Sequence, residues 1–455
     1  MIRLNKLRKW NKKGSSTVLT AMMFVTFAIC VASSIVICRE LTIKSECEVF
    51  GRAWTKAILS EYDLPLLEDY EIMAYFGNDS DVSEKIEHYL DYSTAGRLSI
   101  DIGGANADLT GYELGDANNF LEAVKKGLAG KIASDIASGG GRKERTEVDK
   151  DDIGSEDSGG GEGEASDSGG SGRVIRNKVV LDTLPSEGMG SSFSIDSLVN
   201  KAKTLGSSDG VKNAIVNAGT EIVFIERHFG NAVTYASEKD SFFRNEWEYI
   251  IKGGSDDVEN LKKVKRDLFL MRNALNLLSL YKDPKKVELI LKVAESITPG
   301  PLGLATQLII AEAWALLETE TDMRNLLDNK RVPLIKSAEE WQTGLGAVLD
   351  SNKMKDKLDE ESKELLNENR DEINSLGGIS DRLSSMKEGL NYDEHLMIMI
   401  LAMDERVRLL RIMDIVQINM KYRYYRDFNM MEYYVGTRFT IEANGRSYVF
   451  EDSYK

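Results

Sequence analysis

The sequence predicts a mostly helical α+β protein with a transmembrane helix at its N-terminus, and three observations predict this fold class. Residues 15–38 carry no charge over 24 positions, and about 20 apolar residues suffice to cross a bilayer. Apolar residues recur at spacings of three and four through most of residues 176–430, which is typical of amphipathic helices. Near the C-terminus, Asn444–Gly445 separates two runs of alternating apolar residues, which indicates a β-hairpin.

Residues 1–14 form a tail that predicts the orientation of the apolar stretch. The tail carries no acidic residue and six basic ones, Arg3, Lys6, Arg8, Lys9, Lys12 and Lys13. Because positive charge stays on the cytoplasmic side, we expect a single-pass protein of the cell membrane with residues 39–455 outside. The alternative is a secretory signal cleaved between Ala32 and Ser33. The apolar run continues to Cys38, which favours a retained anchor.

The transmembrane helix is expected to continue beyond the membrane to about residue 61. Helical spacing persists after the apolar stretch, and the first strong breaker is Asp63-Leu64-Pro65. The outer half should therefore form the spine of an external domain. Its apolar face comprises Ile43, Cys47, Phe50, Trp54 and Ile58.

Four small residues share one face of the membrane half, namely Thr17, Ala21, Ala28 and Ala32. Transmembrane helices pack closely on such faces, so the stripe predicts contact with other membrane proteins as well as with membrane lipid. The alternative is a stripe without a partner, since small residues are common in transmembrane helices.

Residues 39–137 are expected to form a small extracytoplasmic α/β module on this spine. Aromatic and aliphatic content predicts strands at Leu64–Phe76, Leu98–Ile102 and Ala107–Leu114. Helical spacing predicts helices at Val82–Tyr92 and Asn118–Ile136. Residues 138–175 interrupt the module as an acidic Gly/Ser linker, which is expected to be disordered because it has almost no apolar surface to bury.

Residues 176–430 are expected to form a helical domain with a bundle-like core. The predicted helices are Asp196–Leu205, Gly210–Phe229, Val258–Tyr281, Lys285–Ile297, Leu302–Leu327, Ala338–Leu349, an exposed helix at Lys353–Arg370, and a long helix at Tyr392–Tyr425. The last helix carries a methionine-rich stripe, which we interpret as core rather than as a partner surface.

Residues 431–455 contain the predicted C-terminal hairpin. A two-residue turn at Asn444–Gly445 sets Ile441 opposite Tyr448 and Phe439 opposite Phe450. An isolated hairpin is marginal in water, so its apolar face should dock on another sheet. We expect it to return to the N-terminal sheet, with Leu64–Phe76 as the acceptor strand.

The charge and cysteine content exclude several classes of protein. The formal net charge is −16, and the basic tail leaves −22 for the remainder, which argues against nucleic acid as a partner. Cys30 and Cys38 belong to the anchor, so Cys47 has no partner for an intrachain disulfide. Pairing of Cys47 with a second copy, in a homo-oligomer, is the alternative to a buried thiol, which its apolar neighbours favour.

The search for chemistry yields no catalytic residue, cofactor site or metal site. The sequence has three histidines and lacks the spacings of zinc sites, nucleophile elbows and phosphate-binding loops. Glu84 and His88, and likewise Glu318 and Asp322, share helix faces on which a cation could bind. Solvated helix faces explain both pairs better, and His395 is interpreted as a polar residue in an exposed first helical turn.

The N-terminus resembles the TadE/TadG-like pseudopilins of tight-adherence (Tad) pilus systems, through Lys13-Gly14-Ser15-Ser16-Thr17-Val18 followed by the long apolar helix. In that family a prepilin peptidase cuts after such a glycine, here between Gly14 and Ser15. The pattern has Glu at the fifth residue after the cut, where this chain has Leu19.

Most of the chain is similar to uncharacterised Gram-positive membrane proteins associated with Tad loci. The matching segments are Glu61–Tyr70, Glu248–Gly253, Trp314–Glu318 and Val332–Lys336. The resemblance implies a pilin-like outline and a non-enzymatic role beside a pilus or secretion apparatus. A surface adhesin and an anchored extracytoplasmic hydrolase are the alternatives. A hydrolase would show a pocket that joins ionisable residues from distant segments, whereas an adhesin would bind a ligand as a purified ectodomain.

Overall fold

The computed structural model describes residues 13–94, 102–137, 173–190, 193–205, 209–211, 219–236, 240–301, 303–350 and 389–454. The chain divides into two compact units. Unit 1 comprises Met1–Tyr62, Ala74–Glu113 and Tyr434–Tyr454, and unit 2 comprises Asp63–Met73 and Leu114–Tyr433. The predicted linker, apart from residues 173–175, and the predicted helix at Lys353–Arg370 lie outside the described residues.

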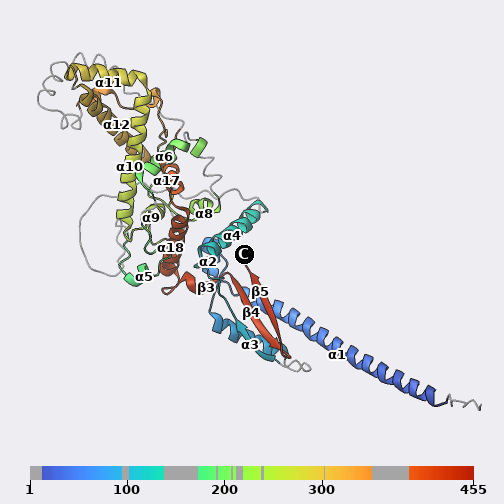
Figure 1. Cartoon of the computed structure of the whole chain (residues 1–455). Coiled ribbons are helices and arrows are strands. Elements are labelled where there is room, and N and C mark those ends of the chain that lie inside the picture. The colour runs from blue at the N-terminus through green and yellow to red at the C-terminus, as the bar shows by residue number, and fades with distance from the viewer. Residues whose placement is uncertain are drawn as a thin grey trace, which may run out of the picture. The chain divides into compact units, whose positions relative to one another are not determined.

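Unit 1 is built around α1 (Lys13–Leu59), a single helix of 47 residues. Its N-terminal part projects from the unit, and its C-terminal part lies against the sheet (Figure 1). Ile43, Cys47, Trp54 and Ile58 are buried, as the helical spacing predicts, and Phe50 packs at the edge of the same cluster. The predicted continuation of the apolar helix into the folded unit is confirmed.

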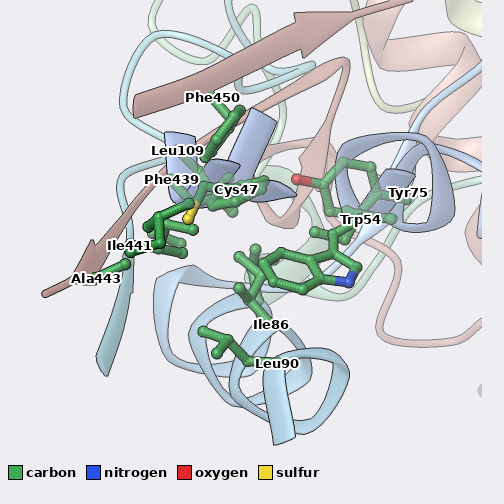
Figure 2. Close-up of a cluster of buried hydrophobic side chains, with 14 residues drawn as sticks. Cys47, Trp54, Tyr75, Ile86, Leu90, Leu109, Phe439, Ile441, Ala443 and Phe450 are labelled. Carbon is green, nitrogen blue, oxygen red and sulfur yellow. The ribbon is translucent and has the colours of Figure 1, made fainter. Parts of the chain in front are cut away.

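A three-stranded antiparallel sheet in the order β2-β4-β5 covers the C-terminal half of α1. It consists of β2 (Ile102–Ala107), β4 (Gly436–Ala443) and β5 (Arg446–Ser453). The hairpin register is the predicted one, with Phe439 opposite Phe450 and Ile441 opposite Tyr448. Figure 2 shows Phe439, Ile441 and Phe450 converging with Cys47 and Trp54 on a common core, against which Tyr448 packs.

The hairpin returns to the N-terminal part of the chain, but the predicted acceptor strand is wrong. The hairpin pairs with β2, with Ala107 opposite Phe439. Residues Leu64–Tyr70 form the helix α2, because the Asp63 side chain accepts a hydrogen bond from the Leu66 amide at 2.8 Å and Pro65 suits a first helical turn.

The remaining short elements of the N-terminal region differ in part from the prediction. Of the predicted strand at Leu64–Phe76, only Tyr75–Phe76 forms a strand (β1). The predicted strand at Leu98–Ile102 lies outside the described residues except for Ile102, where β2 begins. Because β2 ends at Ala107, most of the predicted strand at Ala107–Leu114 is irregular. The helices α3 (Asp79–Thr94) and α4 (Ala117–Ala137) confirm both predicted helices.

Unit 2 is helical, and α10, α11 and α12 pack together (Figure 1). Its helices are α5 (Lys178–Asp182), α6 (Ile195–Leu205), α8 (Thr220–His228), α9 (Glu246–Lys252), α10 (Asp257–Lys282), α11 (Pro284–Ile297), α12 (Gly303–Leu327), α13 (Leu345–Asp350), α17 (Tyr392–Leu401) and α18 (Glu405–Arg423), with short 3₁₀ turns at Ala338–Glu340 (η2) and Met430–Glu432 (η3) before β3 (Tyr433–Tyr434). One core cluster joins α11, α12 and α13 around Trp314 and Trp341.

Two predicted helices of unit 2 are divided in the structure. The segment Ala338–Leu349 contains η2 and then α13, because the Ser337–Glu340 capping box ends in an extended Trp341 whose ring packs on Trp314 at 5.5 Å. The segment Tyr392–Tyr425 divides at Asp404, whose side chain caps the new helix α18 through the Arg406 and Val407 amides. The methionine stripe of this segment is core, as predicted, with Met399, Met413 and Met420 fully buried.

Candidate functional site

The N-terminal half of α1 is long and apolar enough to span a membrane. An 18-residue window in this helix has a mean hydropathy of 2.4 and none of it is buried. Large apolar side chains such as Phe24, Phe27 and Ile35 are exposed on it. The Thr20 and Thr26 hydroxyls donate to carbonyl oxygens four residues earlier, at 2.7 and 2.6 Å. These two hydroxyls therefore bond within the helix, as a lipid environment requires.

The predicted helix-packing stripe lies in this exposed half. Thr17, Ala21, Ala28 and Ala32 are all exposed and follow one face at the spacing of the helix. Gly14 and Ser15, the predicted prepilin cleavage site, lie in the first turn of α1. A signal sequence near an N-terminus would share the length and composition of this helix, so the geometry defines a possible anchor or signal sequence.

Glu318 and Asp322 of α12 do not lie on a solvated helix face, and that expectation is wrong. Both side chains are completely buried. The Lys336 ammonium donates to both carboxylates, and the Arg272 guanidinium donates to Asp322 at 2.7 Å. We call Arg272, Glu318, Asp322 and Lys336 the buried ion cluster. Two cationic side chains thus neutralise the two acidic ones. The cation that Glu318 and Asp322 share is the ammonium group of Lys336.

Neighbouring groups complete the hydrogen bonding of the buried ion cluster. Arg272 donates to the Pro333 and Leu334 carbonyls at 2.9 and 3.0 Å, and Glu318 accepts from the Thr343 amide at 2.9 Å. Burial acts to raise the pKa of Asp322, but Arg272 and Lys336 outweigh it and hold the pKa below its ordinary value. The cluster thus joins α10, α12 and the loop at residues 332–336, including two of the segments that carry the family resemblance.

His395 is also buried rather than exposed, which corrects the sequence-based interpretation. Its Nδ1 lies 2.8 Å from the Asn391 carbonyl oxygen in the first turn of α17. Burial, with Arg272 as a further cause, lowers its pKa to about 3, so the ring is neutral at physiological pH. By contrast, Glu84 and His88 are exposed on α3, as the sequence predicts.

A second polar network surrounds α9, which carries the segment Glu248–Gly253. Tyr392 donates to Glu248 at 2.8 Å, and the Ala232 amide donates to the same carboxylate oxygen at 3.2 Å. The other carboxylate oxygen of Glu248 is buried without a hydrogen bond. Burial therefore raises the pKa of Glu248 to about 7.

The C-terminal end of α9 is tied to α18 by a related set of bonds. Tyr249 donates to Asp414 at 2.9 Å, and the Ser186 hydroxyl donates to the same carboxylate. Arg411 donates to the Ile250 and Ile251 carbonyls at 2.9 and 2.6 Å, which satisfies carbonyls that the end of the helix leaves open. Burial raises the pKa of Asp414 to about 6. These groups bond to one another inside the helical core.

Sequence reasoning missed the residues that pair with the predicted acids. Arg272 and Asn276 interrupt the apolar face of α10 at positions where Met271 and Leu275 predict burial. A charged or amide side chain on a buried face is the sequence signal that could have identified both residues, because a buried charge needs an opposite charge and a buried amide needs hydrogen-bond partners. Lys336 lies in a loop, so its sequence context carried no comparable signal.

A cavity of 340 Å³ in unit 2 lies between the end of α5, the helix α18 and the 3₁₀ turn η3. It is lined by Gly115, Asp182, Thr183, Leu184, Pro185, Leu410, Gln417, Asn429, Met430 and Met431. Asp182 is its one ionisable lining residue, so the cavity does not join several such groups. In the part of the chain that the structure describes, no group of three or more His, Cys, Asp or Glu side chains is arranged to hold a metal ion.

The fold and these networks define a mostly helical α+β protein with a membrane-spanning or signal-type N-terminal helix and ion pairs in its helical core. The chain belongs to DUF5702, a family of unknown function, whose match covers residues 168–445. No curated protein and no solved structure matches the chain.

Proposed function

We propose that this protein is a non-enzymatic, single-pass membrane protein that acts beside a Tad or type IVc pilus or secretion apparatus, as a pseudopilin-like component or an assembly factor. The observation that carries the proposal is the division of α1 into two halves. The N-terminal half exposes apolar side chains, and the C-terminal half is the spine of unit 1. A helix that continues from lipid into a folded core suits an anchor that is retained.

The charge distribution supports an orientation with both units outside the cell. The basic tail of residues 1–14 favours the cytoplasm, and the remainder carries a formal charge of −22. The other polar groups with shifted pKa values in unit 2, such as Glu248 and Asp414, bond to neighbours within the core. This supports a structural use of these groups rather than a hydrolytic one.

Cysteine crosslinking along α1 tests the proposed contact with membrane proteins of the apparatus. Single cysteines replace Thr17, Ala21, Ala28 and Ala32 in full-length protein whose Cys30 and Cys38 are changed to alanine, in membranes of the native host. Matched controls are Leu19→Cys and Ile37→Cys, which lie about 200° around the helix from Thr17 at about 100° per residue.

We expect the stripe positions, and not Leu19 or Ile37, to crosslink to a membrane protein encoded with the pilus apparatus and identified by mass spectrometry. Equal crosslinking on both faces, or crosslinking only to proteins unrelated to the apparatus, would contradict the proposal. Crosslinking only between copies of this chain would replace it with a homo-oligomer.

A further inference from the structure

The β4–β5 hairpin runs alongside α1, as three contacts along its length show. Arg446 bonds Glu40 at 2.8 Å, the Phe450 ring lies over Gly51, and the Tyr454 hydroxyl donates to the Leu59 carbonyl. From Glu40 to Leu59 the helix rises about 28 Å. From Arg446 to Tyr454 the strand rises about 27 Å. Because the two rises agree, β5 follows α1 in the same direction over this length, and it crosses the helix obliquely (Figure 1).

This alignment fixes the level of the hairpin turn along the helix axis. Arg446 is level with Glu40, which follows Cys38, the last residue of the uncharged stretch, by two positions. Two residues correspond to about 3 Å of helix. The headgroup layer on each side of a bilayer is about 5 to 8 Å thick. If the uncharged stretch spans the hydrocarbon, the turn lies within the headgroup layer.

The surface at this level has the chemistry of a headgroup contact. The hairpin tip, Glu442–Arg446, turns through Asn444 and Gly445 with φ angles of 49° and 73°, and Gly445 faces open space. The side chain of Arg446 is 63% exposed although it bonds Glu40. A guanidinium has five N–H donors, so Arg446 can also donate to a lipid phosphate. Arg39 adds a second cation at this level of α1, and Lys44, which pairs with Glu48 at 3.8 Å, lies about one helical turn farther from the membrane.

We propose that the hairpin tip rests in the phosphate layer of the bilayer, beside the point where α1 leaves the membrane. The inference depends on the proposed anchoring of α1. In this arrangement no segment of α1 separates the sheet of unit 1 from the bilayer surface. Arg446 is level with the lipid phosphates, and the strands lead away from the membrane. Asp452, six residues along β5 from Arg446, is then up to about 20 Å farther from the membrane than Arg446.

Fluorescence quenching by spin-labelled lipid tests this arrangement. Full-length protein with Cys30 and Cys38 changed to alanine is reconstituted in vesicles of equal parts phosphatidylcholine and phosphatidylglycerol. Asn444→Cys, Asp452→Cys and Val25→Cys each carry an environment-sensitive fluorophore. The unsubstituted background protein corrects for any labelling of Cys47, which is buried. One quencher is a lipid with a nitroxide on its headgroup, and the other carries the nitroxide on its acyl chain.

We expect the headgroup nitroxide to quench the Asn444 probe several-fold more than the Asp452 probe, and the acyl-chain nitroxide to quench the Val25 probe. A quenched Val25 probe with an unquenched Asn444 probe would overturn the hairpin contact and leave the anchor intact. Equal strong quenching at Asn444 and Asp452 would also overturn it, because the sheet would then lie flat on the bilayer. An unquenched Val25 probe would contradict the proposed membrane insertion of α1 and, with it, the proposed contact of the hairpin tip with the bilayer.

Discussion

Glu248 keeps a carboxyl group in the core of unit 2 with one oxygen bonded and the other without a partner. Its pKa rises from 4.5 to about 7, because burial disfavours the charged form. Folding thus favours the protonated acid. The resulting stabilisation is complete below about pH 4.5 and is lost as pH rises through 7. The negative charge of Asp257 also acts to raise the pKa of Glu248. Burial lowers the pKa of Lys265, and the charge of Glu248 in turn acts to raise it.

Glu248→Gln should therefore reduce the pH dependence of stability. Glutamine can still accept from Tyr392 and Ala232, but it removes the buried negative charge. Between pH 6.5 and 8.5 we expect the wild type to lose more stability than the variant, which should be more stable at pH 8.5 by about 2 to 3 kcal/mol. Thermal unfolding at both pH values measures this.

The exposed Glu259 of α10 provides the matched control, since Glu259→Gln should leave the pH dependence unchanged. His395 acts in the opposite direction, because its lowered pKa removes stability as pH falls below its ordinary value of 6.5. The chosen pH range keeps that effect small. Equal pH dependence in the wild type and Glu248→Gln would show that Glu248 is ionised in the folded chain.

The buried ion cluster predicts that replacing the buried Lys336 destabilises the protein far more than replacing the exposed Lys292. Lys336→Met leaves Glu318 and Asp322 with only Arg272 to compensate two buried negative charges. We expect a loss of about 3 to 5 kcal/mol in the free energy of unfolding, measured by denaturant titration. Lys292→Met is the control, since the Lys292–Glu288 pair is exposed and solvent screening should leave the stability nearly unchanged. A small effect at Lys336 would mean that the cluster is open to water.

At the scale of elements, the packing of β5 on α1 depends on a glycine in the helix. A Cβ atom at Gly51 would lie 2.3 Å from the Phe450 ring, so only glycine allows this approach. Glycine costs a helix roughly 0.5 to 1 kcal/mol relative to alanine. The cost is offset at Gly51 by the buried aromatic contact, whereas Gly130 of α4 has no neighbour within 4 Å at the corresponding position.

These two helical glycines should respond in opposite ways to alanine. Gly51→Ala should destabilise unit 1 by about 1 to 3 kcal/mol, because the Phe450 ring must move. Gly130→Ala should stabilise α4 by about 0.5 to 1 kcal/mol. Hydrogen exchange measured by mass spectrometry should show faster exchange in β5 for Gly51→Ala and slower exchange in α4 for Gly130→Ala. Unchanged exchange in β5 would indicate that Phe450 does not fix the hairpin on α1.

At the scale of the whole molecule, the charge asymmetry predicts the side of the membrane on which each end lies. Six positive charges precede the apolar stretch and a formal charge of −22 follows it. Translocating the basic tail would oppose the positive-inside preference, so both units should face the exterior.

Labelling of intact cells tests this orientation. With Cys30 and Cys38 changed to alanine, a membrane-impermeant maleimide should label Asp452→Cys without cell disruption. It should label Asn5→Cys only after the cells are opened. Labelling of Asn5→Cys in intact cells would reverse the orientation, and recovery of the chain from the medium would instead favour a cleaved signal sequence.

The sequence by itself determined the apolar helix, its continuation as a spine through Trp54 and Ile58, and the turn and register of the hairpin at Asn444–Gly445. These features follow from local periodicity and turn chemistry, which neighbouring residues encode. The helix α2 was missed because aromatic content outweighed the capping signal of Asp63. Only the tertiary structure decided that β2 receives the hairpin and that Lys336 lies between Glu318 and Asp322. Burial of a charge depends on partners brought from other elements, and helical spacing alone does not show whether such a partner arrives.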